Sequence, residues 1–293
     1  MQASIGKSGA NAAKADQEAD LINSFEGKAW FRNFYGSPIR RKLSDRKIEA
    51  RSTTHLSQED VDRMLASGKK DFRYFILRDI DFSGRDLTGA NFDNCDLSGS
   101  NFRGSKLKST SFDNANLKLV DLKDSKIENS SMEMAKLEGA SFENVDLRRV
   151  RLTLLPIRNV NFKGANLSHQ KLRDLLNCNF DRAKLAGARL FKGFGTAFKG
   201  DAFDTMWLQT LARKYEKEKS PNTSAAKLSF RDADLTGAEL SGFDFAGTDF
   251  EGATMNGTVF KGCSGFGGAN MKGTKLEGVD LAQYENAGFG LMV

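Results

Sequence analysis

Large apolar side chains recur at every fifth position along the middle of this chain. The run begins at Leu77 and reaches Leu172 without a slip, and each member, here called a central residue, is Leu, Phe, Ile or Met. An amphipathic helix would show a spacing near 3.6 residues and a half-buried strand a spacing of about two. A period of five fits neither element, so it predicts a repeat architecture built from five-residue units.

A second, smaller residue lies two positions before most central residues, as at Ala90, Cys95 and Ser100. The position just before the centre is usually polar, and the position two after it is often Gly or Asn, which favour tight turns. Each unit therefore predicts a short extended piece with two inward side chains, followed by a corner. Four corners close a square, so we expect side chains twenty positions apart, such as Phe82 and Phe102, to stack.

The five-residue units resemble a known repeat. Segments such as ADLTG, ANFDN, CDLSG and SNFRG are similar to the units of the pentapeptide-repeat family. The resemblance implies an all-β solenoid, a right-handed quadrilateral β-helix with four units in each coil. It says little about function, because one fold hosts many unrelated functions.

The period is interrupted at three places, and these divide the chain. The spacing from Leu172 to Phe180 is eight, where we expect a bulge. The period stops after Leu190, restarts at Phe230 and gains one residue before Phe266. The expected segments are a disordered or export-signal segment 1–24, a helical N-terminal cap 25–71, β-helix 72–190, a helical insertion 191–227, β-helix 228–283 and a tail 284–293.

The N-terminal cap contains one clear helix signal. Ser57, followed three positions later by Asp60, resembles a capping box, and Gly68 is suited to end the helix that Ser57 opens. Arg85 and Gln170 occupy the usually small inward position near the two ends of the first run. We expect them to lie at capped ends of the solenoid, because terminal repeats must face solvent or a neighbouring element.

An aromatic cluster lies just before a basic cluster within segment 25–71. An aromatic face beside positive charge can dock onto a membrane surface or a partner. Aromatic side chains that cover the open first coil would instead be structural, and both interpretations stay open. The residues are Trp30, Phe31, Phe34, Tyr35, Arg40 and Arg41.

The insertion 191–227 carries an apolar stripe. Phe203, Trp207, Leu211 and Tyr215 are four positions apart, so they share one face of a predicted helix. A tightly wound coil cannot absorb a helix of this length. The helix is expected either to pack on the solenoid or to project and bind a partner.

Charge is distributed unevenly along the chain. The formal net charge is +6, and residues 76–190 hold 19 basic and 15 acidic side chains. The densest local cluster is Arg148, Arg149, Arg151 and Arg158. Such a cluster is either a solvated face or a binding surface for an anionic partner.

Nothing in the sequence indicates an active site. His55 and His169 are the only histidines, and neither is near a nucleophile in a spacing typical of catalysis. We expect Cys95 and Cys178 to be small buried side chains, with no disulfide, metal site or cofactor. The chain is therefore interpreted as a non-enzyme.

No apolar stretch is long enough to span a membrane, and no apolar segment of a classical signal peptide follows Met1. The expected place of synthesis is the bacterial cytoplasm. The expected function is a protein-interaction scaffold or adaptor. Segment NFYGSPIRR is similar to the region ahead of the repeats in PipB-like type III secreted effectors. That similarity implies secretion into a host cell, a role in virulence, and action on host proteins or a host membrane surface.

The alternative is a DNA mimic that interacts with DNA gyrase, as some members of the resembled family do. That mechanism requires a dominantly acidic rod, whereas residues 76–190 are net basic. Direct nucleic-acid binding is not expected either, because no recognition motif accompanies the positive charge. A protein partner is therefore the main expectation.

Overall fold

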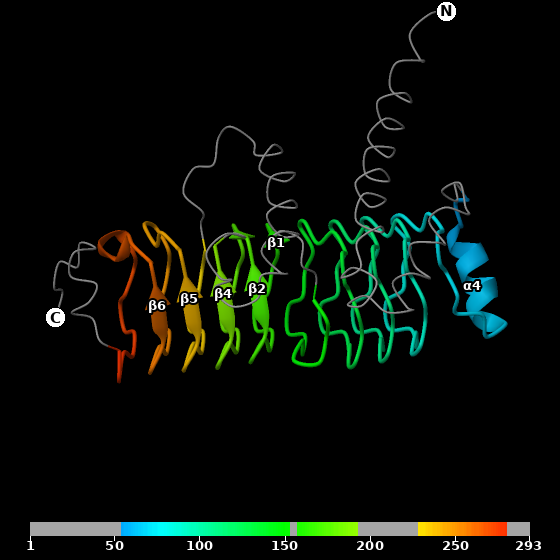
Figure 1. The fold of residues 1–293 in the computed structure, drawn as a ribbon. Coiled ribbons are helices and arrows are strands. Elements are labelled where there is room, and N and C mark those ends of the chain that lie inside the picture. Colours follow the sequence, from blue (N-terminus) through cyan, green and yellow to red (C-terminus); the bar gives the residue numbers. More distant parts are fainter. Residues whose placement is uncertain (1–53, 153–156, 193–227, 280–293) are drawn as a thin grey trace, which may run out of the picture. The chain divides into compact units, whose positions relative to one another are not determined.

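The computed structural model describes residues 54–152, 157–192 and 228–279, all within one compact unit, Thr53–Val293. These residues wind into square coils stacked along one axis (Figure 1). Helix α4, Gln58–Ala66, lies at the N-terminal end of the stack, and the short 3-10 helix η1, Phe266–Gly268, lies at its C-terminal end.

Regular strands are short and belong to the second half of the described coils. Strands β2, β4, β5 and β6 form a parallel four-stranded sheet in that order, and β1 pairs in parallel with β3. Their bounds are Ile157–Arg158 for β1, Lys171–Arg173 for β2, Leu175–Leu176 for β3, Arg189–Phe191 for β4, Glu239–Ser241 for β5 and Val259–Lys261 for β6.

Elsewhere the coils are joined by single parallel bridges with a constant register. Asp71 pairs with Asn91, Asn91 with Ser111, and Ser111 with Ser131. The amide of the residue after each bridge position completes the link, as where Phe92 donates to the Ser111 carbonyl at 2.7 Å. The predicted right-handed quadrilateral β-helix with a twenty-residue coil is confirmed.

We name the four faces of the β-helix A to D in the order in which the chain visits them. Face A is defined by central residues Phe72, Phe92, Phe112, Met132, Leu152, Leu172, Leu190, Leu240 and Phe260; face B by Leu77, Leu97, Leu117, Leu137, Ile157 and Leu175; face C by Phe82, Phe102, Leu122, Phe142, Phe162, Phe180, Phe230 and Phe250; and face D by Leu87, Leu107, Ile127, Leu147, Leu167, Leu185, Leu235 and Met255.

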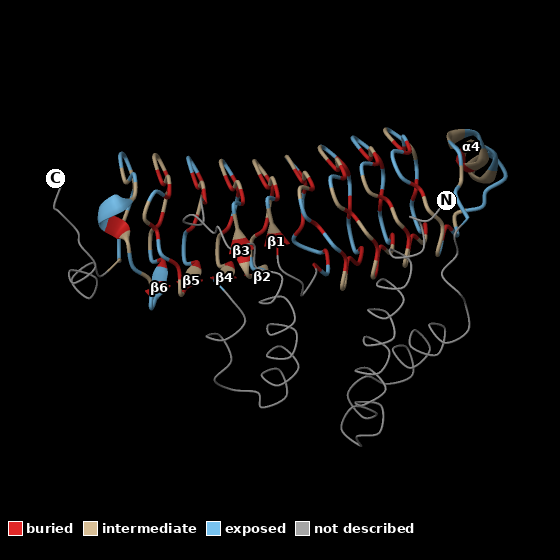
Figure 2. Ribbon diagram, turned by 90° about the horizontal axis from the view of Figure 1, so that it is seen from above, coloured by how far each residue is buried: buried red, intermediate tan, exposed pale blue. Residues whose placement is uncertain are grey.

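The core is a continuous column of central residues. Each central residue of the four faces is at most 8% exposed, and most are fully buried. The smaller inward residues, among them Ala90, Ala115 and Val145, fill the space between them. Figure 2 shows the buried positions along the inside of the coils and the exposed positions at the corners.

Phenylalanine rings stack along the axis. On face C, Phe162 stacks on Phe142 at 5.5 Å and on Phe180 at 5.2 Å between ring centroids. The stack continues from Phe180 to Phe230 at 5.1 Å, although fifty residues separate these two positions in the sequence. Each of these rings packs against a ring of the coil before it and a ring of the coil after it. The stacked rings therefore join successive coils into one continuous core.

Several buried hydroxyl groups at the small inward positions are bonded to the backbone. Ser100 Oγ donates to the Leu77 carbonyl at 2.6 Å, and Thr110 Oγ1 donates to the Leu87 carbonyl at 3.0 Å. In both cases the acceptor belongs to the central residue of the preceding coil. Ser125 Oγ and Thr248 Oγ1 are the exceptions among the described residues, because they are buried without a hydrogen-bond partner.

Most corners place one residue in the left-handed backbone region. Gly and Asn are common there, but Leu119, with φ of 59°, occupies such a corner and is 70% exposed. A β-carbon in this region costs about 1–2 kcal/mol. Only glycine fits at position 265, where φ is +75°, because the β-carbon of any other residue would lie 2.6 Å from the backbone nitrogen of Ala246.

Helix α4 covers the N-terminal end of the core. The predicted capping box is present: Ser57 accepts from the Asp60 amide, and the Asp60 carboxylate accepts from the Ser57 amide. Val61 is fully buried against the core. Asp62 of α4 forms an ion pair with Arg85, so the expected position of Arg85 at a capped end is confirmed.

Gln170 was expected at a capped end, and this prediction is wrong. Its side-chain amide donates to the carbonyls of Leu147 at 2.6 Å and Val150 at 3.0 Å inside the stack. The Gln170 amide thus makes the same kind of hydrogen bond to a carbonyl of the preceding coil that the Ser100 and Thr110 hydroxyls make at other inward positions. The run of central residues also begins one unit earlier than Leu77, because Phe72 is fully buried.

The expected bulge between Leu172 and Phe180 is absent. Leu175 instead pairs with Ile157, so this coil has eighteen residues, two fewer than the regular coil. The corner is shortened around Asp174, whose φ is 46°. Loss of two residues keeps the alternation of inward and outward side chains, and Leu175 enters the core at 2% exposure. The one-residue insertion near Phe266 is confirmed, since Asp249 pairs with Asn270.

We predict that Phe162→Ala lowers the free energy of unfolding by about 3–5 kcal/mol, because the change leaves a cavity between two stacked rings. Leu119→Asn is the matched control, since Leu119 is large and apolar but exposed. It should leave stability unchanged or raise it by about 1 kcal/mol through relief of the left-handed backbone. Urea unfolding followed by circular dichroism measures both variants, and equal losses would contradict the prediction.

Candidate functional site

The edge between faces A and B carries the two largest departures from the regular register. The first is the shortened corner between Leu172 and Leu175. The second follows β4: Arg189 pairs with Glu239, fifty positions later instead of twenty. A solenoid accommodates insertions at its corners, so this edge is where the chain departs most from a plain scaffold.

Basic side chains gather along the same edge. Lys171 and Arg189 are direct partners in the β2 and β4 register, and Arg173 lies opposite Phe191. Arg151 occupies the equivalent position to Lys171 one coil earlier. We call this set the basic edge. It consists of Arg151, Lys171, Arg173, Arg189 and Lys192.

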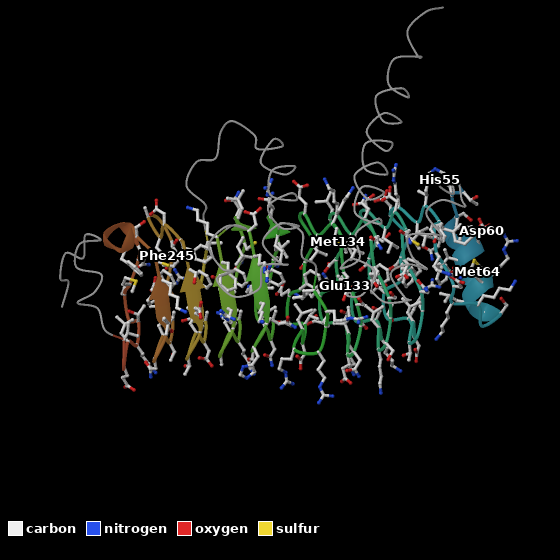
Figure 3. The ribbon with its side chains drawn as sticks, viewed as in Figure 1. His55, Asp60, Met64, Glu133, Met134 and Phe245 are labelled. Carbon is white, nitrogen blue, oxygen red and sulfur yellow. The ribbon has the colours of Figure 1, made fainter. Side chains whose placement is uncertain are left out.

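A carboxylate accompanies the first member of the basic edge, since Arg151 Nε lies 3.5 Å from Glu133 Oε1. On the neighbouring face B, Arg158 Nη2 lies 3.4 Å from Asp174 Oδ2. Glu133 is labelled in Figure 3 next to Met134, on the coil that precedes Arg151. The side chain of Arg151 is 70% exposed, so its long contact with Glu133 adds little stability.

Glu239 organises the other end of the edge. Arg189 Nη2 lies 3.5 Å from Glu239 Oε1, and Lys261 Nζ lies 3.1 Å from Glu239 Oε2. Burial opposes ionisation of Glu239, but the hydrogen bond from Lys261 and the charge of Arg189 outweigh it, so its pKa lies below the ordinary value. The Arg189 guanidinium also lies 5.4 Å from the centroid of the Phe191 ring.

The edge arginines hold their carboxylates loosely. At Arg148, by contrast, Nε donates to Asp146 Oδ1 at 3.0 Å and Nη2 donates to Oδ2 at 2.6 Å, which is a forked pair. The Nε atoms of Arg158 and Arg189 are buried and make no well-formed hydrogen bond, although Arg189 Nε lies 3.5 Å from Glu239 Oε2. A partner cannot reach these buried atoms, so the exposed cations of the basic edge, Arg151, Lys171 and Lys192, are the ones available for binding.

The structure separates the four arginines that the sequence groups together. Arg151 lies on face A, one position before Leu152. Arg158 follows Ile157 of face B, toward the corner with face C, and Arg148 and Arg149 lie at the corner between faces D and A, after Leu147. Of the predicted cluster, therefore, only Arg151 belongs to the basic edge.

The other candidates from the sequence lie outside the described residues. They remain predictions, as do the expected segment boundaries. The candidates are Trp30, Phe31, Phe34, Tyr35, Arg40 and Arg41 of the N-terminal cap, and Phe203, Trp207, Leu211 and Tyr215 of the insertion.

Sequence reasoning missed Lys171, Arg173, Arg189 and Lys192. These residues are scattered over more than twenty positions, so they form no charge run. The signal that could have found them is the eighteen-residue register, which makes Lys171 and Arg189 neighbours.

The described cysteines are free thiols with little access to solvent. Cys95 and Cys178 are 2% exposed, and burial raises the pKa of each to about 12. Cys263 is half-buried, and burial also raises its pKa. These thiols are protonated near neutral pH, so they are poor nucleophiles.

The histidines lie in structural positions. His55 forms a bridge with Ile76, and the His169 ring lies over Gly187 at a corner. Within the described coils, no three His, Cys, Asp or Glu side chains are grouped so that they could hold a metal ion. Across the same residues, no helix has the length and apolar character needed to cross a bilayer.

One family model matches the chain. It describes pentapeptide repeats, with eight copies that cover residues 76–114, 115–153 and 229–264. These ranges coincide with the regular coils of the β-helix. No curated protein matches the sequence.

Solved structures of pentapeptide-repeat proteins match the coils at low identity. A trypsin-treated form of QnrB1, a plasmid-mediated fluoroquinolone resistance protein, is 20% identical, with 76% of this chain and 90% of that chain covered and a TM-score of 0.32. HetL from the cyanobacterium Nostoc sp. strain PCC 7120, which is involved in heterocyst differentiation regulation, is also 20% identical, with 75% and 95% covered and a TM-score of 0.30. A protein from the Arabidopsis thaliana thylakoid lumen is 26% identical, with 41% and 71% covered and a TM-score of 0.25.

We predict that a thiol reagent at pH 8 modifies Cys263 first, and that Cys95 and Cys178 react only when the protein unfolds. Their pKa of about 12 leaves almost no thiolate at that pH, and the coils block access. Labelling is followed by absorbance with and without denaturant. Cys263→Ser should abolish the native-state reaction, and fast labelling of the native Cys263→Ser variant would refute the prediction.

Proposed function

Because this chain belongs to the pentapeptide-repeat family, we propose that it is a non-enzymatic scaffold that binds a protein partner through the basic edge. The observation that carries the proposal is the gathering of five cations on face A and at its corner with face B, where the register departs most from regularity. A rigid frame that presents a charged surface is suited to binding, because little ordering is needed when a partner arrives.

The described chemistry supports binding over catalysis. Its thiols are protonated, and most ionisable groups on the faces are engaged in ion pairs between successive coils, as in Arg103 with Asp121 and Lys123 with Glu143. Such pairs stabilise the stacking of coils. On the basic edge, the exposed Lys171 and Lys192 form no ion pair with the described residues, so their charge is available to a partner.

The more specific form of the proposal is a bacterial effector that is made in the cytoplasm and passes into a host cell by type III secretion. The similarity of segment NFYGSPIRR to PipB-like effectors supports it, and that segment lies outside the described residues. In this form the protein acts on host proteins or at a host membrane. A gyrase-binding DNA mimic gains no support from the faces, because residues 76–190 carry 19 basic and 15 acidic side chains.

The partner-binding proposal is tested by pull-down from a cell extract with quantitative mass spectrometry. The edge variant is Lys171→Glu with Lys192→Glu, and the matched control is Lys106→Glu with Lys126→Glu on face D, where both lysines are also exposed. Each variant changes the net charge equally. We expect a specific protein to be enriched about tenfold by wild type and control, and lost with the edge variant.

The pull-down also includes a deletion variant that lacks residues 196–222. Retention of the partner by this deletion, with loss by the edge variant, assigns binding to the basic edge. Equal loss with the edge and face D variants would contradict the proposal, because net charge alone would then explain the binding.

The effector proposal is tested by fusing residues 1–75 to a translocation reporter. We expect reporter activity in host cells when the bacterium has a functional type III system, and none from a mutant that lacks the system. Transfer from both strains, or from neither, would refute this specific form and leave the scaffold proposal standing.

A further inference from the structure

We propose that the C-terminal end of face C is a docking surface for residues 289–292 of the same chain, which pair with the backbone around Met271 and cover the apolar core. The occupant of this end is the chain itself and not a second copy or another protein. The basic edge plays no part in this contact.

The two ends of the described core differ in how well they are covered. At the N-terminal end, helix α4 packs on the first coil and its Val61 is fully buried (Figure 1). At the C-terminal end, the central residues Met271 and Leu276 are only partly buried, although they pack on the core. Their equivalents one coil earlier, Phe250 and Met255, are fully buried. Because the last repeat of a solenoid needs a cover, this end requires one.

The backbone of the last described coil also lacks partners on face C. One coil earlier, the amides of Phe250 and Gly252 donate to carbonyls of the next coil at 2.8 and 2.9 Å. The equivalent amides, those of Met271 and Gly273, have no acceptor among the described residues. A row of unpaired backbone groups at the edge of a parallel stack is a template for a further extended segment.

The sequence after the described coils has apolar side chains at the spacing that this edge requires. Leu281 and Leu291 both fall on the five-residue period of Met271 and Leu276, which only Asn286 interrupts. Leu291 lies twenty positions after Met271, and twenty residues make one regular coil. A regular coil would therefore bring Leu291 onto face C, directly over Met271.

Large side chains occupy the usually small inward positions of this segment, as they do in the first coil. Phe75 and Ile80 are the large inward residues of the coil that α4 covers, and both pack on the core. Tyr284 and Phe289 lie at the same place in the period, two positions before 286 and 291. A large inward side chain suits the end of a solenoid, because it fills space that no further coil occupies. The two ends of the repeat thus share a feature in the sequence.

The regular register specifies the hydrogen bonds. Between regular coils, the amide of a central residue donates to the carbonyl nineteen positions later, and so does the amide two positions after it. Applied to this end, the rule pairs the Met271 amide with the Gly290 carbonyl. It also pairs the Gly273 amide with the Met292 carbonyl. Leu291, between the two acceptors, then points inward.

A second copy of the chain is the other occupant that such an edge attracts. The local segment has the advantage, because residues that are joined to the edge by a short stretch of chain are present at about millimolar effective concentration. Leu281 and Leu291 are ten positions apart, which corresponds to two sides of a regular coil. The connection is therefore long enough to reach face C without strain.

The test measures hydrogen exchange of single amides by NMR in the full chain and in Leu291→Asp, which places a charge at the apolar end. We expect the Met271 and Gly273 amides to be protected in the wild type and to exchange about tenfold or more faster in Leu291→Asp. Gln283→Asp is the matched control, because it adds the same charge at a position off the inward pattern. The Gly252 amide, bonded to the next coil, is the internal control and should exchange equally in every variant.

A deletion variant that lacks residues 284–293 is measured with and without a synthetic peptide of the same residues. Loss of protection at Met271 and Gly273 in the deletion variant, and its return with the peptide, support the proposal. Equal exchange of these amides in wild type and deletion variant would overturn it. Protection that falls when the wild type is diluted, together with a dimer seen by light scattering, would assign the edge to a second copy and overturn it as well.

Discussion

Parallel backbone hydrogen bonds between successive coils are the constraint on which the rest of this β-helix depends. Each residue before a central position pairs with the equivalent residue one coil away, as Asp71 does with Asn91. Because every inward side chain must then lie on the inward side chain of the next coil, apolar or small side chains are favoured at those positions, and Gln170 fits only because its amide bonds the backbone. The five-residue period in the sequence results from this stacking of inward side chains. Outward side chains do not have to pack against the next coil, so charged residues at those positions can take part in binding.

The same constraint decides where irregularity is tolerated. A coil may lose or gain residues at a corner, provided that the next strand returns in register and with the same side chains inward. The shortened coil satisfies this condition, since Leu175 enters the core beneath Ile157. The long departure after β4 also satisfies it, since Phe230 stacks on Phe180 at 5.1 Å. Both departures fall next to face A, and so they leave the aromatic stack of face C uninterrupted.

The fold could be read from the chain because inward positions are encoded locally. A period of five, with sorted columns such as Phe82 and Phe102, is visible without any knowledge of neighbours, and these rings do stack at 4.7 Å. The basic edge could not be read in the same way. Lys171 and Arg189 become neighbours only through a coil of eighteen residues, and Arg189 meets Glu239 only across fifty positions. A local charge run such as Arg148, Arg149, Arg151 and Arg158 was therefore a poor guide, because a coil spreads adjacent residues over different faces.

The contrast between Arg148 and Arg189 explains why local charge density and binding capacity differ on a solenoid. Arg148 meets a carboxylate two positions earlier in its own coil, so the pair forms a tight fork and its charge is neutralised locally. Arg189 meets its carboxylate only on the adjacent coil, where one Glu239 is shared with Lys261 and the contacts lengthen to 3.5 Å. One carboxylate shared by two cations neutralises each of them less completely than the fork at Arg148 does. The positive charge that a solenoid presents to solvent therefore depends on which residues the register brings together, and less on how closely basic residues follow one another in the sequence.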